Sequence, residues 1–164
     1  MSSITVKCPL NSLSFGNVSL NLLRELYKKN ISVSLFPIGD KSDLSAYDKL
    51  DEKFRQWVES SVNTRLETVK PENQQLQLWH INGSESKISS SKNTLLTFYE
   101  LDQPTKEEVN LVKLQDHVVF SSKHAYDLFK SRGCENVSHI EMGFDPDFTK
   151  NQDRKLEGRV HFVL

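Results

Sequence analysis

Short apolar runs alternate along this chain with longer stretches in which apolar residues recur every three or four positions. The short runs are rich in β-branched residues and predict buried strands. The longer stretches predict amphipathic helices, each with one face against a core. The predicted strands cover residues 4–8, 31–36, 76–81, 94–99, 117–120 and 137–141.

Capping residues mark the ends of the predicted helices, which cover about 17–27, 47–58, 105–114 and 122–132. Small polar residues at these starts can accept hydrogen bonds from the first free backbone N–H groups. The candidate caps are, in chain order, Asn17, Asp43 or Ser45, the Thr105–Glu108 capping box, and Ser121 or Ser122. Gly133 suits the position just past the last helix, and the polar stretch 63–75 predicts a loop.

Strands that alternate with helices predict an α/β fold, a Rossmann-like three-layer sandwich with a mostly parallel sheet. The length of 164 residues favours one domain over residues 1–148. Residues 149–164 are expected to be a linker and then an apolar strand, 160–164. We interpret this strand as the first of an absent second domain, or as a swapped edge of this one.

Composition narrows the classes of partner. Net charge is −1, so no strong field attracts nucleic acid or anionic lipid, and any charged ligand must be held by local groups. Cys8 and Cys134 are expected to be buried or incidental thiols. The N-terminus shows no signal peptide and no apolar run approaches the ~20 residues that span a bilayer, so a cytoplasmic location is expected. Peripheral membrane contact is left open.

Several kinds of site are excluded by their missing motifs. No histidine pair has the spacing of metal ligands, and there is no Cys-x-x-Cys, so no metal is expected. The chain has neither a P-loop nor a Gly-x-Ser-x-Gly nucleophile elbow. Aromatic residues do not interleave with basic ones as they do on nucleic-acid surfaces.

The loop before the first helix is a candidate for phosphate or acceptor binding. It contains Phe15, Gly16 and Asn17. In an open α/β sheet, ligands bind beyond the carboxyl ends of the strands, where a glycine and a helix N-terminus can receive a phosphate. The ordinary alternative is a tight turn with a helix cap, which the local sequence alone favours because only one glycine is present.

Polar residues also follow the predicted fourth strand. Tyr99 and Glu100 lie where a parallel sheet places its active site, and a carboxylate there can accept a hydrogen bond from a sugar hydroxyl or take a proton. We therefore name both as candidate catalytic residues. The alternatives are a solvated Glu100 and an Asp102 that only caps the next helix.

Two further loops carry candidate binding residues. His80 and Asn82 follow the third predicted strand, where a histidine suits proton chemistry near neutral pH; the alternative for His80 is a core or rim position. Ser121, Ser122 and Lys123 follow the fifth strand, where they can contact a ligand or, as helix starts commonly do, cap the helix.

Residues 116–145 resemble the part of the N-terminal domain that precedes the linker in GT-B glycosyltransferases, in particular the retaining, bacterial-type branch. The resemblance lies in a strand, a serine-capped helix that ends at Gly133, and a second strand followed by a Gly-x-Asp turn. That last part contains Asn136, Val137, Ile140, Gly143, Asp145 and Phe148. Residues 97–104 also resemble a segment of these enzymes, and 15–17 lie where their glycine loop lies.

This resemblance implies one half of a GT-B fold, the acceptor-side domain of an enzyme that moves a sugar from a nucleotide-sugar donor. Such enzymes generally need neither a bound metal nor a resident cofactor. It implies that Gly16 lies near the donor phosphate or the acceptor, and that Glu100, beside Tyr99, lines a pocket for a sugar, glycan or glycolipid. The donor-binding residues would lie on the absent C-terminal domain, so the chain alone is expected to have little transferase activity.

The chain also departs from these enzymes, many of which carry a histidine near the position of Tyr99 or Glu100. An alternative function is a non-catalytic α/β module that binds a protein or small ligand, since fold alone does not settle function. A surface left uncovered by an absent domain would also favour a homodimer.

Overall fold

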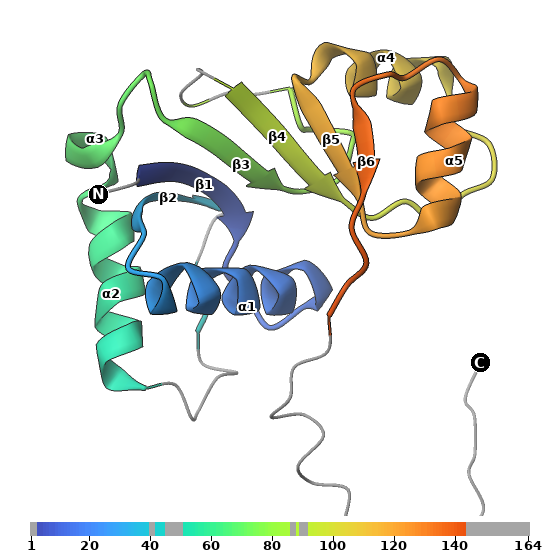
Figure 1. Ribbon diagram of the computed structural model, residues 1–164. Coiled ribbons are helices and arrows are strands. Elements are labelled where there is room, and N and C mark those ends of the chain that lie inside the picture. The colour runs from blue at the N-terminus through green and yellow to red at the C-terminus, as the bar shows by residue number, and fades with distance from the viewer. Residues whose placement is uncertain (1–2, 40–41, 45–50, 86–87, 89–91, 144–164) are drawn as a thin grey trace, which may run out of the picture.

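The computed structural model describes residues 3–39, 42–44, 51–85, 88 and 92–143. It is an α/β fold with one six-stranded, all-parallel sheet in the order β2-β1-β3-β4-β5-β6 (Figure 1). The strands are β1 (Ser3–Pro9), β2 (Ser32–Ile38), β3 (Gln74–Leu78), β4 (Lys92–Thr97), β5 (His117–Phe120) and β6 (Val137–His139). The predicted Rossmann-like sandwich with a mostly parallel sheet is confirmed.

Helices cover both faces of the sheet. They are α1 (Ser14–Lys28), α2 (Glu52–Asn63), α3 (Arg65–Thr68), α4 (Lys106–Leu114) and α5 (Lys123–Ser131). Leu78 of β3 packs with α1, whereas Leu95 of β4 packs with α4 and α5. Because Leu95 pairs in register with Gln77, these two leucines point to opposite faces of the sheet. The sheet therefore separates α1 and α2 from α4 and α5.

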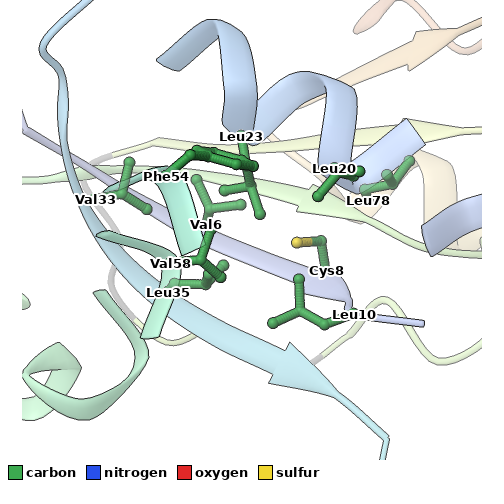
Figure 2. Close-up of a cluster of buried hydrophobic side chains, with 10 residues drawn as sticks. All are labelled: Val6, Cys8, Leu10, Leu20, Leu23, Val33, Leu35, Phe54, Val58 and Leu78. Atoms are coloured by element: carbon green, nitrogen blue, oxygen red, sulfur yellow. The ribbon is translucent and has the colours of Figure 1, made fainter. Parts of the chain in front are cut away.

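The core under α1 and α2 is almost entirely aliphatic (Figure 2). Side chains from two helices and three strands meet there: Val6, Cys8, Leu10, Leu20, Leu23, Val33, Leu35, Phe54, Val58 and Leu78. Full burial of each large apolar side chain contributes roughly 1.5–3 kcal/mol. This core holds α1 firmly against β1, and so fixes the start of the helix at the carboxyl edge of the sheet.

The core on the other face is built around stacked phenylalanines. The rings of Phe120 and Phe129 lie 4.8 Å apart, and both side chains are fully buried. Val112 of α4 and Ala125 of α5 pack in the same cluster. Gly133 follows α5 with a φ of 78°, a left-handed conformation that confirms its predicted place as the C′ glycine.

Two of the predicted caps are confirmed. Thr105 and Glu108 form the full capping box of α4, and the Ser122 hydroxyl accepts a hydrogen bond from the Ala125 amide at the start of α5. Each cap depends on residues within a single helical turn, which is why the local sequence predicts it.

The predicted cap of α1 is wrong. The helix begins at Ser14, and its N-cap position is Leu13 rather than Asn17. The Leu13 amide donates to the side-chain oxygen of Asn11 at 3.0 Å, which forms a turn that starts the helix earlier. Asn17 consequently lies inside the first turns of α1.

The start of α2 also differs from the prediction. Asp51 caps α2, in place of Asp43 or Ser45. Residues 47–50 of the predicted helix, and the candidate cap Ser45, lie outside the described residues.

Strand boundaries differ as well. Residues 63–75, predicted as a loop, contain α3 and the beginning of β3. β3 and β4 end at Leu78 and Thr97, before the predicted ends, and β6 ends at His139. His80, Tyr99 and Glu100 therefore lie in loops beyond the strands. The predicted linker and strand over 149–164 lie outside the described residues. No helix in the described ranges is long and apolar enough to cross a bilayer.

Candidate functional site

A pocket of about 490 Å³ lies at the carboxyl edge of the sheet. It is formed by the first turn of α1, the loops after β3 and β4, and one side chain of α4. The lining residues are Ser14, Phe15, Val18, His80, Ile81, Asn82, Phe98, Tyr99, Glu100, Leu101 and Glu108. This volume is in the range of small-molecule sites.

Strand order explains why the pocket forms here. From β1 the chain passes through α1 to β2 on one side, while β3 and β4 lie on the other side of β1. The connections after β1 and β3 therefore diverge, and the crevice between them is the place where open α/β sheets bind ligands. The start of α1 and the loop that carries His80 both border this crevice.

One wall of the pocket is aromatic. The ring of Phe15 lies 4.6 Å from the ring of His80, 4.9 Å from that of Phe98 and 5.9 Å from that of Trp79. Edge-to-face pairs of this kind contribute about 0.5–1.5 kcal/mol each beyond the burial of area. Phe15 thus joins the start of α1 to the loops after β3 and β4, and its ring also faces the pocket.

A second wall of the pocket is polar and is organised by Glu108. One carboxylate oxygen accepts hydrogen bonds from the Thr105 amide at 2.8 Å and from the Tyr99 hydroxyl at 3.1 Å. The other accepts one from the Asn82 side chain at 3.4 Å. Glu108 is 8% exposed, so these donors replace the water that a buried carboxylate would lack.

Sequence analysis finds Glu108 only as part of a capping box. A capping glutamate uses one lone pair on its own helix start, which leaves the rest of its carboxylate available to neighbouring loops. The signal is therefore present in the sequence, but the partners Asn82 and Tyr99 become apparent only once the loops after β3 and β4 are placed beside α4.

Tyr99 is held in its protonated form. Burial, together with the hydrogen bond and the negative charge of Glu108, raises the pKa of Tyr99 to about 12. Its ring packs edge-on against Phe129 at 5.0 Å. At neutral pH the Tyr99 side chain is consequently a hydrogen-bond donor, and it does not act as a proton acceptor.

Glu100 differs from Glu108 in its surroundings. It is exposed and lines the mouth of the pocket. Among the residues that the structure describes, none donates a hydrogen bond to its carboxylate. Glu100 is therefore the carboxylate that a ligand hydroxyl or a ligand cation can engage.

A buried chain of amides fixes the loop that carries His80 and Asn82. Gln75 donates to the Asn93 side-chain oxygen at 2.7 Å, and the Asn93 amide group donates to Gln115. Gln115 in turn donates to the Ser84 hydroxyl at 3.1 Å, and that hydroxyl donates to the carbonyl of Ile81 at 2.6 Å. The chain runs from β3 and β4 to the loop, so it holds the pocket residue Ile81 in place.

Not all predicted site residues meet in the pocket. Phe15, His80, Asn82, Tyr99 and Glu100 line it, whereas the other five lie elsewhere: Gly16, Asn17, Ser121, Ser122 and Lys123.

Gly16 is buried, and a Cβ there would lie 1.9 Å from the carbonyl oxygen of Asn11. This close backbone approach is a packing reason for glycine at position 16. Asn17 is on the exposed surface of α1. Ser122 caps α5, and Lys123 pairs with Asp127 one turn along the same helix. The Ser121 amide donates to the Thr97 carbonyl at 3.4 Å.

The chemistry of the pocket follows from its lining. Two carboxylates, an imidazole, an amide and the rings of Phe15 and Phe98 line it, and among the described residues no lysine or arginine does. In the part of the chain that the structure describes, no three His, Cys, Asp or Glu side chains gather as a metal site. Comparisons with protein-family models, with curated proteins and with solved structures gave no match.

Proposed function

We propose that this domain is the acceptor-side half of a glycosyltransferase, and that the pocket at its carboxyl edge receives a hydroxyl-bearing acceptor such as a sugar. The observation that carries the proposal is the meeting of Phe15, His80 and Glu100 in one pocket at the point where the strand order diverges. Residues from three separate segments contribute to it, as expected for a small-molecule site in this architecture.

The pocket suits a sugar because of how its groups are arranged. A sugar ring has an apolar face that can pack on Phe15 and Phe98, and hydroxyl groups that both donate and accept hydrogen bonds. Glu100 accepts from such hydroxyls, while the Ser14 hydroxyl and the Asn82 amide offer donors. A nucleotide-sugar donor would be held by a second domain facing this edge, and the main catalytic stabilisation would act at the leaving diphosphate there.

A second candidate function is a non-catalytic module that binds a protein. Leu13 is 70% exposed and Leu101 is 60% exposed, and both lie beside the pocket. Large exposed apolar side chains at one edge favour coverage by another polypeptide. A partner domain of the proposed enzyme would provide the same coverage, so these leucines are compatible with both functions.

The two functions are distinguished by binding of small ligands. We expect glucose and short glycans to shift the amide resonances of Phe15, His80 and Glu100 in two-dimensional NMR titrations. Glu100→Ala should weaken this binding about tenfold or more, the effect of one lost hydrogen bond to a charged group. Glu72→Ala is the matched control, because Glu72 is an exposed glutamate before β3, at the opposite edge of the sheet.

The outcome decides between the candidates. Equal binding by the wild type and Glu100→Ala would remove Glu100 from the site. If no sugar shifts any pocket resonance, the acceptor function fails and the protein-binding module becomes the better proposal. We propose the cytoplasm as the compartment, since Cys8 and Cys134 are buried free thiols.

A further inference from the structure

We infer that the pocket selects ligands by charge: it favours a ligand that carries a protonated amine and disfavours one that carries a phosphate or carboxylate. For the hydroxyl-bearing scaffold this inference rests on the proposed function. The preference for positive charge rests on the lining of the pocket alone, so the two can fail separately.

The fixed charges of the pocket are negative. Glu100 and Glu108 both line it, and among the described residues no lysine or arginine does. The Glu108 carboxylate accepts hydrogen bonds from Asn82, Tyr99 and Thr105, which hold it in place at the pocket. An anionic ligand would have to give up its water while facing both carboxylates.

Among the described parts of the pocket, the start of α1 favours an anion most. Ser14 and Phe15 belong to its first turn, and no side chain caps this end of the helix. The partial charge of a helix N-terminus is about +0.5, which is smaller than the charge on either carboxylate. The sum of these charges is therefore negative, and the pocket favours a cation.

Two basic residues at the start of α5, Lys123 and His124, pair with carboxylates outside the pocket. The Lys123 ammonium pairs with Asp127 and lies 5.1 Å from the centre of the Tyr126 ring. His124 lies 3.3 Å from a carboxylate oxygen of Asp102. Neither residue lines the pocket, so neither supplies the positive charge that a phosphate would need.

The aromatic wall provides a second preference for a cation. The rings of Phe15 and Phe98 line the pocket and lie 4.9 Å apart. A positive charge within about 6 Å of an aromatic face is attracted by the electrons of the ring. An ammonium group placed between this wall and Glu100 would be attracted by both the rings and the carboxylate, whereas a phosphate would be attracted by neither.

The test uses ligands of one shape and three charges. Glucosamine, glucose and glucose 6-phosphate are titrated by NMR or calorimetry at pH 7. We expect glucosamine to bind about tenfold more tightly than glucose, and glucose 6-phosphate to bind most weakly. Raising the salt to about 0.5 M should shrink these differences, since Glu100 is exposed.

Variants assign the preference to a residue. Glu100→Gln should reduce the ratio of glucosamine to glucose affinity to about threefold or less, whereas the control Glu72→Gln should leave the ratio at its wild-type value. Because Glu100 is exposed, its replacement is not expected to unfold the domain.

Each outcome is decisive. If glucose 6-phosphate binds as tightly as glucose or more tightly, the inference is overturned and the start of α1 governs the pocket. If no sugar binds, the proposed function fails, and benzylamine and benzoate then test the charge preference without a sugar. Tighter binding of benzylamine would retain the inference, and equal or tighter binding of benzoate would end it.

Discussion

The two walls of the pocket are held in place by different forces. The aromatic wall around Phe15 depends on ring packing between α1 and the loops after β3 and β4. The polar wall depends on the hydrogen bonds that Tyr99, Thr105 and Asn82 donate to Glu108. Packing tolerates replacement by another apolar side chain of similar size, whereas a buried carboxylate surrounded by donors does not.

The polar wall should therefore lose more stability on substitution than the aromatic wall. When Glu108 is removed, several donors lose their acceptor together. When Phe15 is shortened, two of its neighbours, Trp79 and His80, retain their own ring contact at 5.2 Å. The experiments below test this difference, beginning with the polar wall.

Glu108→Ala should produce the largest loss of stability, about 3 kcal/mol. It removes the capping box of α4 and leaves the Tyr99 hydroxyl and the Thr105 amide without their acceptor. Urea unfolding followed by circular dichroism measures the change. Glu107→Ala is the matched control, since Glu107 is an exposed neighbour on the same helix turn and its loss should cost under about 0.5 kcal/mol. Similar losses of stability in the two variants would show that the hydrogen bonds to Glu108 add nothing beyond what an exposed residue of the same helix contributes.

Phe15→Ala should cost about 1–2 kcal/mol, less than the loss of a fully buried phenylalanine because the Phe15 side chain is half-buried. Phe15→Leu should recover most of this stability but should not restore ligand binding, since stacking on a sugar face or an ammonium needs the ring. Thermal unfolding and NMR titration on the same samples separate the two effects. Full binding by Phe15→Leu would exclude a stacking role.

The smallest effect is expected from the ionisation of Tyr99. The pKa of Tyr99 is raised to about 12 in the folded protein. The protonated side chain therefore adds to the free energy of unfolding in full below the ordinary tyrosine pKa of about 10. This contribution is lost as the pH rises from about 10 through 12. We expect a loss of about 1 kcal/mol in that range, less than the full shift would give, since the side chain is half-buried and solvent screens part of the interaction.

The free energy of unfolding in urea, measured between pH 9 and 12 for the wild type and for Tyr99→Phe, gives this loss of stability. The variant has no hydroxyl to ionise, so its stability should decline less steeply over this range. Parallel curves for the two proteins would show that Glu108 does not hold the Tyr99 proton.

The local sequence was sufficient to predict several features of this protein. The bounds of β5, the capping box of Thr105 and Glu108, and Gly133 at the end of α5 all match the structure. Each depends on residues within one turn or one short run, where neighbours along the chain set the conformation. The parallel α/β architecture followed from the alternation of strands and helices.

Other features were decided only by the tertiary structure. Phe15, His80 and Glu100 meet because β1, β3 and β4 are neighbours in the sheet, an order that no local pattern encodes. Gly16 is buried under the Asn11 carbonyl, and Glu108 binds donors from two other loops. Sequence spacing fixes what a residue does to its own helix or strand; the contacts between loops arise from how the sheet brings distant segments to one edge.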